Sequence, residues 1–113
     1  MKANSLRLFL VLLCVNISFQ LHAQQGEADR KLLADLRAKA ENGDAQSQYE
    51  LAVAFDFGKL GVTKDYAEAI KWFRKAAEQN NAAAQENLGQ CYEVGEGVPK
   101  DYAEAVKWYL NGT

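Results

Sequence analysis

The chain has 113 residues, of which 49% are hydrophobic and 25% charged, a composition typical of a folded globular domain rather than a disordered segment. Its formal net charge of −2 provides no basic field that would gather phosphate groups. The length therefore limits the chain to a single domain, and the charge argues against nucleic acid as a partner.

Residues 1–23 are interpreted as an export signal peptide. Lys2 and Arg7 give a positively charged start, and residues 8–15 form an apolar run. Polar residues then interrupt this run, at Asn16, Ser18 and Gln20. The run is thus shorter than the ~20 residues that a membrane-spanning helix needs. We expect cleavage after Ala23, a secreted or periplasmic product and no stable membrane insertion afterwards; the alternative is an ordinary N-terminal helix of the mature fold.

Removal of residues 1–23 leaves 11 basic and 15 acidic residues, and hence a net charge of −4. It also leaves no histidine and a single cysteine, Cys91. One cysteine cannot form a disulfide within the chain, and free cysteines on helices are commonly buried apolar thiols. We therefore expect Cys91 to be buried, with pairing between two chains as the alternative.

The first mature segment, residues 24–43, is expected to hold a helix over about residues 27–42. The apolar stripe of this helix consists of Leu32, Leu33 and Leu36. Its sequence resembles the second helix of the repeat unit that follows, because Arg37, Ala40, Glu41 and Ala45 recur 37 residues later as Arg74, Ala77, Glu78 and Ala82. We therefore expect this segment to form half of a repeat unit, followed by two complete units.

Residues 44–80 and 81–113 predict two copies of a helix-loop-helix unit. Residues 64–73 reappear, with few changes, as residues 100–109. The first helices match at a shift of 37, pairing Gln48, Leu51, Ala52 and Phe55 with Gln85, Leu88, Gly89 and Tyr92. In each helix these residues have the i, i+3, i+4, i+7 spacing of one helical face. The small residue after the leucine should let a second helix approach closely.

Capping residues mark the expected helix ends. The first helices should begin after the N-caps Asp44 and Asn81 and end in left-handed conformation at Gly58 and Gly95. The second helices open with a capping-box spacing, at Asp65 with Glu68 and at Asp101 with Glu104. In such a box the aspartate accepts first-turn amides and the glutamate reaches back to the cap. Aromatic residues alternating with alanines predict structural roles for Trp72, Phe73, Trp108 and Tyr109, with Trp72 at the margin of the packing face.

The second repeat resembles the Sel-one-like repeat family, a relative of the tetratricopeptide repeats. The resemblance rests on three motifs, Leu88-Gly89 with Tyr92, Gly95-Glu96-Gly97-Val98, and Asp101-Tyr102 with Ala105. The first repeat departs from the family pattern at Ala52, at Phe55 and in a loop that is one residue longer. The resemblance implies an all-α fold, an α-solenoid of about two full helix-turn-helix repeats plus the preceding half repeat. It also implies a scaffold for protein or peptide partners.

Carried over from the tetratricopeptide pattern, the concave surface would be lined by the first helix of each repeat. The candidate binding residues are Gln46, Tyr49, Val53, Asp56, Phe57, Glu86, Gln90 and Glu93, with Ala83 and Val94 beside them. Tyr49, Val53 and Phe57 lie opposite Leu51, although the N-terminal helix could instead cover them. The carboxylates of Asp56, Glu86 and Glu93 would favour a basic partner segment; the alternative is an ordinary solvated surface.

The mature sequence offers few groups for catalysis. Without a histidine, neither Ser47 nor Cys91 can form a Ser-His or Cys-His dyad within one chain. Cys91 alone also cannot build a zinc site. We therefore expect no enzymatic activity, no metal and no cofactor. Cysteine-rich members of the family have been associated with penicillin-like and cell-wall ligands, but the paired cysteines of that subgroup are absent here.

Two binding hypotheses follow. In the first, the chain is an exported scaffold or adaptor that binds a peptide or protein through its concave face. In the second, it is a self-associating structural module or a piece of a longer repeat array. The second hypothesis rests on the last helix, which stops at residues 110–113 where the first repeat continues through residues 74–77. About two repeats is also fewer than the ~3 that stable stacking usually needs.

Overall fold

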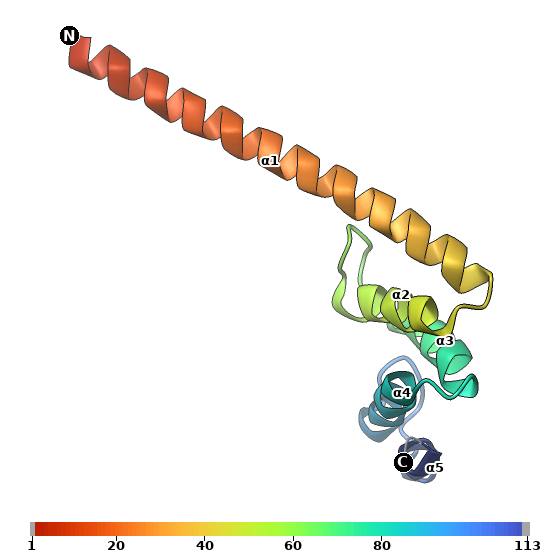
Figure 1. The fold of residues 1–113 in the computed structure, drawn as a ribbon. Coiled ribbons are helices and arrows are strands. Elements are labelled where there is room, and N and C mark those ends of the chain that lie inside the picture. Colours follow the sequence, from red (N-terminus) through yellow and green to blue (C-terminus); the bar gives the residue numbers. More distant parts are fainter. Residues whose placement is uncertain (1, 112–113) are drawn as a thin grey trace.

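The computed structural model describes residues 2–111, which form five α-helices and no strand. The helices are α1 (Lys2–Glu41), α2 (Ala45–Phe57), α3 (Tyr66–Glu78), α4 (Ala82–Val94) and α5 (Tyr102–Asn111). Each helix packs against the next one along the chain, so α2 to α5 form a stack beside the C-terminal part of α1 (Figure 1). This arrangement confirms the all-α solenoid. Residues 112 and 113, which the sequence assigns to the second repeat, lie outside the described range.

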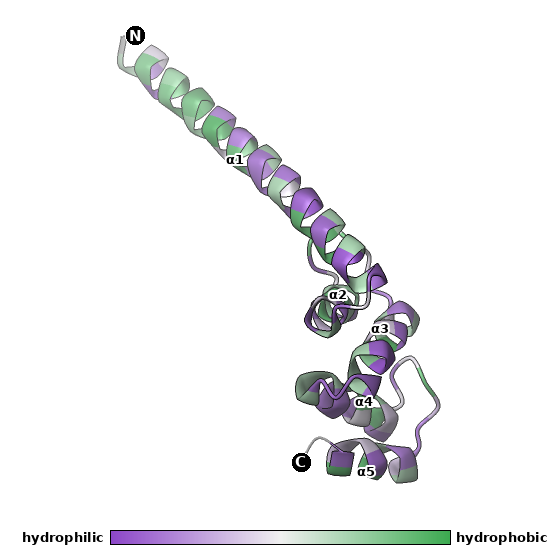
Figure 2. Cartoon of the chain, turned by 45° about the vertical axis from the view of Figure 1, so that its right-hand side comes forward, coloured by the Kyte–Doolittle hydropathy of each residue, from purple (hydrophilic) through white to green (hydrophobic). Residues whose placement is uncertain are grey.

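The expected signal peptide and the half repeat form one continuous helix, α1, which passes through the expected cleavage position without a break. Polar residues at Asn16, Ser18 and Gln20 do not interrupt it, because a polar side chain inside a helix costs only tenths of a kcal/mol. The N-terminal half is apolar and exposed (Figure 2). By length and composition, Ala3–Glu41 is the one helix of the described chain that could cross a membrane, a test that signal sequences also pass.

The C-terminal part of α1 takes the structural place of a second helix, as the half-repeat interpretation predicts. Gln48 of α2 donates a buried hydrogen bond from Nε2 to the carbonyl oxygen of Ala40, at 3.0 Å. Gln85 of α4 makes the same bond to the carbonyl oxygen of Ala77 in α3, at 3.1 Å. Because both partners recur at a shift of 37 residues, the α1–α2 contact is equivalent to the α3–α4 contact.

The predicted capping residues are confirmed, but only the aspartate half of each predicted capping box forms. Side chains of Asp44, Asn81, Asp65 and Asp101 each accept a first-turn amide, and Gly58 and Gly95 have positive φ angles of 65° and 79°. The expected reach of the glutamates back to the caps is wrong. The Asp65 amide instead donates to the Phe55 carbonyl at 2.9 Å, and the Asp101 amide to the Tyr92 carbonyl at 2.8 Å. These bonds tie the end of each first helix to the start of its second helix.

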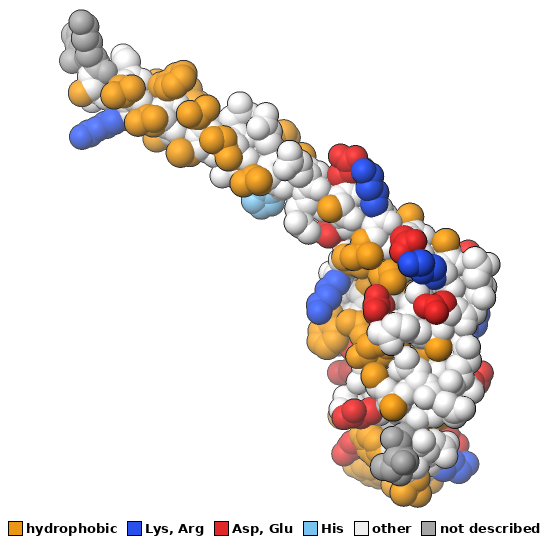
Figure 3. Space-filling view, in the orientation of Figure 1, with side chains coloured by type: hydrophobic (Ala, Val, Ile, Leu, Met, Phe, Trp, Pro, Cys, Tyr) orange, Lys and Arg blue, Asp and Glu red, His pale blue; other side chains and the backbone are white. Residues whose placement is uncertain are grey.

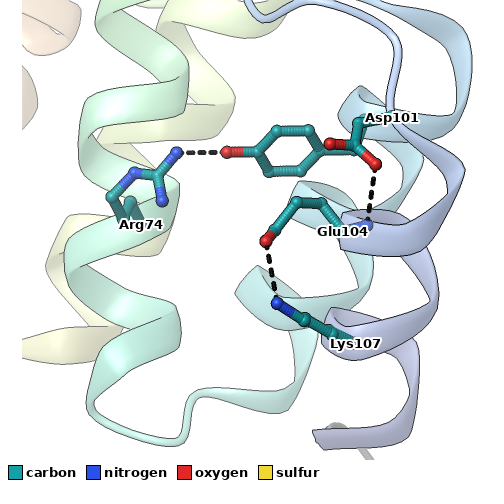
Figure 4. A network of polar contacts seen from close by, with 5 residues as sticks. Arg74, Asp101, Glu104 and Lys107 are labelled. Carbon is teal, nitrogen blue, oxygen red and sulfur yellow. Dashed lines mark hydrogen bonds and ion pairs between the residues drawn. The ribbon is translucent and has the colours of Figure 1, made fainter.

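With the cap amides already bonded, the glutamates are available to other side chains. Glu68 accepts a hydrogen bond from Trp72 Nε1 at 3.2 Å and also pairs with Lys71 at 3.5 Å. Glu104 pairs with the equivalent lysine, Lys107, at 3.2 Å. Figure 4 shows the Glu104–Lys107 pair, the Asp101 cap and Arg74, whose guanidinium donates to the Tyr92 hydroxyl. The glutamate–lysine pair is therefore common to both repeats, whereas, among the described residues, the tryptophan hydrogen bond to the glutamate occurs only in the first repeat.

The core lies between consecutive helices, and its fully buried large side chains are Phe73, Leu51 and Leu88. Trp72 is only 3% exposed, so its expected place at the margin of the packing face is wrong. It packs inside the same core as Phe73. The predicted close approach of helices is confirmed at Gly89, where an added Cβ would lie 2.7 Å from the Tyr109 ring.

Candidate binding groove

A groove of about 390 Å³ lies between the C-terminal ends of α2 and α4. Its lining comes from the last turn of α2, from one face of α4 and from the loop after α4. The lining residues are Asp56, Phe57, Asn87, Gln90, Cys91, Glu93, Val94 and Glu96. The groove therefore joins the two complete repeats at the ends of their first helices.

Four of the eight candidate residues meet in this groove, namely Asp56, Phe57, Gln90 and Glu93. The other four lie elsewhere. Gln46 lines a separate hollow between α1 and α2, and Glu86 is exposed on α4 outside both hollows. Tyr49 and Val53 are half-buried and pack against the core, where the Tyr49 ring centroid lies 6.0 Å from that of Phe73.

Three lining residues were not among the sequence candidates: Asn87, Cys91 and Glu96. Asn87, Cys91 and Val94 have the i, i+4, i+7 spacing of a single helical stripe, which is a signal that the sequence did contain. Glu96 lies in the loop, and its place at the groove depends on how the loop folds. No helical periodicity could have indicated it.

The apolar part of the groove consists of Phe57 and Val94, whose side chains are 63% and 61% exposed. The Lys59 ammonium lies over the Phe57 ring, 5.1 Å from its centroid. This contact places a cation of the chain itself against one face of the Phe57 ring.

The acidic part of the groove consists of Asp56, Glu93 and Glu96. Burial raises the pKa of Asp56, the neighbouring Glu96 carboxylate raises it further, and Lys64 opposes the shift. Glu93 accepts a 2.6 Å hydrogen bond from the Tyr109 hydroxyl, and burial together with this bond raises the pKa of Tyr109 to about 12. The groove thus concentrates negative charge beside two exposed apolar side chains.

The raised pKa of Asp56 predicts an effect of Asp56→Asn on stability. A carboxyl group with a folded-state pKa above its unfolded value stabilises the fold below the unfolded pKa, about 4. That contribution is lost as the pH rises through the folded pKa. Asp56→Asn should therefore raise the urea midpoint at pH 7 and leave it nearly unchanged at pH 3. The exposed control Glu86→Gln should change little at either pH, and a lower midpoint for Asp56→Asn at pH 7 would contradict this reading.

Cys91 forms part of the groove wall and is buried, as the sequence predicts. Burial raises the pKa of its thiol to about 11, with further contributions from Asp56 and Glu96. Because the thiolate is the reactive form, Ellman's reagent at pH 8 should modify Cys91 on the order of 100-fold more slowly in the folded chain than in guanidinium. The measurement needs the Cys14→Ser variant, since Cys14 is exposed. Equal rates would show that the thiol is accessible.

The described residues contain no cluster of three or more histidine, cysteine, aspartate or glutamate side chains that could hold a metal ion. The groove instead combines exposed apolar surface with carboxylates, which can bind a segment of another protein without covalent chemistry.

The fold and the groove define a solenoid of helix pairs with a surface groove between repeats. The Sel1 repeat family matches residues 45–81 and 82–111, so the chain belongs to this family, as its resemblance to the Sel-one-like repeats indicated. Sel1 repeat proteins are protein-interaction modules and are generally non-catalytic scaffolds.

Two curated proteins are similar to the repeat part of the chain. The ERAD-associated E3 ubiquitin-protein ligase component HRD3A of Arabidopsis thaliana is 32% identical over 77 residues, which cover 68% of this chain and 11% of HRD3A. DAP3-binding cell death enhancer 1 of Rattus norvegicus is 41% identical over 55 residues, which cover 49% of this chain and 11% of that protein. The chain thus spans about a ninth of the length of these relatives.

Three solved structures share the fold. One is c5321, a protective antigen present in uropathogenic Escherichia coli strains, with 48% identity, a TM-score of 0.67, and coverage of 71% of this chain and 17% of that one. A Sel1 repeat protein from Oxalobacter formigenes has 32% identity, a TM-score of 0.68 and coverages of 71% and 60%. Helicobacter pylori cysteine rich protein B has 28% identity, a TM-score of 0.70 and coverages of 74% and 62%.

Proposed function

We propose that the chain is an exported protein-interaction module that binds a peptide or protein segment in the groove between α2 and α4. The observation that carries this proposal is the pair of exposed apolar side chains, Phe57 and Val94, set among carboxylates in a hollow. Apolar anchors in a concave, polar-rimmed site are typical of binding surfaces. Figure 3 shows hydrophobic and acidic side chains gathered along one side of the repeat stack.

The remaining candidates extend this proposed surface. Gln46 and Glu86 are exposed on the same two first helices and would contact the partner beyond the groove. Tyr49 and Val53 would act mainly through packing, since the core holds both of them. Two relatives support a protein as the partner, because one is named as a component of a ubiquitin ligase and the other as binding DAP3.

A photo-crosslinking amino acid at Phe57 or Val94, introduced into the chain in its own host, tests the groove. Both positions should yield adducts with the same partner protein. Lys71 on α3 is exposed and outside the groove, so the crosslinker placed there is the control. Adducts that form equally at Lys71, or none at the two groove positions, would refute the groove as the binding site.

Export is proposed from the exposed, apolar N-terminal half of α1. Residues 1–23 would direct the chain across the membrane and be removed after Ala23. Intact mass of the chain purified from its host should correspond to a mature N-terminus at Gln24. Recovery of the uncleaved chain in the membrane fraction would show that α1 is an anchor instead.

Self-association is a second candidate, favoured by the exposed apolar face of α5. Tyr102 and Val106 on this helix are both exposed. A partner helix over α5 could cover both side chains. Light scattering and urea unfolding at several concentrations test this, because a monomer with a concentration-independent midpoint would exclude it.

A further inference from the structure

Two carboxylates of the groove lack partners. Within residues 2–111, neither Asp56 nor Glu96 accepts a side-chain hydrogen bond or forms an ion pair. Asp56 is half-buried, so its charge has lost part of its hydration without a compensating donor. In contrast, the half-buried Glu68 accepts a hydrogen bond from Trp72. The free chain therefore holds negative charge inside the groove that no hydrogen bond or ion pair of the described residues satisfies.

The repeat explains why Asp56 lacks a donor. Glu93 occupies the position of Asp56 in the second repeat, and Tyr109 occupies that of Phe73. Tyr109 donates its hydroxyl hydrogen to Glu93 at 2.6 Å. Phe73 has no hydroxyl group and is fully buried in the core. The first repeat thus has the acidic residue but not the phenol that satisfies it in the second repeat.

Among the described residues, no lysine forms an ion pair with the carboxylates of the groove. None of the lining residues is basic. Lys64 lies close enough to Asp56 and Glu96 to interact with both charges, but without an ion pair. The nearby lysines are placed 4.8–5.1 Å from aromatic ring centroids, Lys59 over Phe57, Lys64 over Tyr66 and Lys100 over Tyr102. A cation from a partner would therefore meet a complementary, unpaired charge.

We infer that the partner segment carries a lysine or arginine side chain that enters the groove and pairs with Asp56 and Glu96, while an adjacent apolar side chain packs on Phe57 and Val94. This inference rests on the proposed function of the groove. A guanidinium fits particularly well, because it donates in a planar fork to carboxylates and stacks on aromatic faces. The groove volume, about 390 Å³, lies near the lower end of ligand pockets and suits a side chain or two rather than a domain surface.

Four fluorescein-labelled peptides test the inference, with the sequence Gly-Ser-Leu-X-Phe-Ser-Gly and X as arginine, lysine, norleucine or glutamate. Fluorescence anisotropy with the purified chain should show about tenfold tighter binding for arginine than for norleucine. In the Asp56→Asn/Glu96→Gln variant the two peptides should bind alike. Glu78→Gln is the matched control and should keep the preference, because Glu78 is exposed at the end of α3 and lies outside the groove. Unfolding midpoints of both variants establish that the fold is intact.

Equal binding of the arginine and norleucine peptides by the unaltered chain would overturn the inference. Tighter binding of the glutamate peptide, or no binding of any of the four, would overturn it as well. The proposed function is tested separately by the crosslinking experiment, because that experiment detects a partner at Phe57 and Val94 whatever the charge of the partner. Crosslinks without a basic preference would mean that the groove binds a partner of different chemistry.

Discussion

Phe73→Ala is expected to lower the free energy of unfolding by about 3–5 kcal/mol, a large part of the stability of a small domain. Phe73 is fully buried at the centre of the core, and its ring contacts that of Tyr49 from α2. Removal of the ring leaves a cavity between α2 and α3 and also removes this aromatic contact. Urea unfolding followed by circular dichroism measures the loss.

Phe57→Ala is the matched control, since it removes the same ring from a side chain that is 63% exposed. Its effect on unfolding should stay within about 0.5 kcal/mol. A loss of about 3 kcal/mol for Phe57→Ala would place Phe57 in the core and would remove the apolar wall of the proposed groove. A loss below about 1 kcal/mol for Phe73→Ala would instead contradict the core described above.

Most of the architecture could be predicted because the fold repeats local contacts. Gln48 and Gln85 recur at a shift of 37, and each makes the same buried bond to the preceding helix. These two glutamines thus meet equivalent surroundings. The half repeat in α1 could be identified for the same reason, since Ala40 stands where Ala77 stands one unit later.

Contacts that depend on the path of a loop could not be predicted. The capping-box spacing at Asp65 and Glu68 is local, but the amide of Asp65 bonds to Phe55, ten residues earlier across the loop. That bond leaves Glu68 free to accept from Trp72. Glu96 similarly reaches the groove through the fold of its loop.

The candidate site was predicted only in part, for a related physical reason. Helical periodicity tells which face of α2 a residue is on, but not how deeply the neighbouring helix covers that face. Tyr49 and Val53 share the predicted face with Phe57, yet they pack against the core while Phe57 at the helix end is exposed. The distance of a residue from the helix end therefore decides its exposure as much as its face does.

Gly97→Ala should cost about 2–5 kcal/mol, because two effects combine at this position. Gly97 has a φ angle of +72°, a left-handed conformation that costs another residue about 1–2 kcal/mol. An added Cβ would also lie 2.7 Å from the Tyr66 carbonyl oxygen and 2.9 Å from Ile70 Cγ1. Moving the loop or α3 apart adds about 1–3 kcal/mol.

Gly61 is the equivalent glycine of the first repeat and provides the control, because it has a φ angle of +79° but nothing within 4 Å of an added Cβ. Gly61→Ala should therefore cost only the backbone part, about 1–2 kcal/mol, in the same urea titration. The difference between the two variants measures the packing of the second loop on the first repeat. Equal losses would mean that this loop can move away freely. A larger loss at Gly97 would show that the second loop packs firmly on α3, and this contact between the repeats helps to hold the groove between α2 and α4 in a fixed shape.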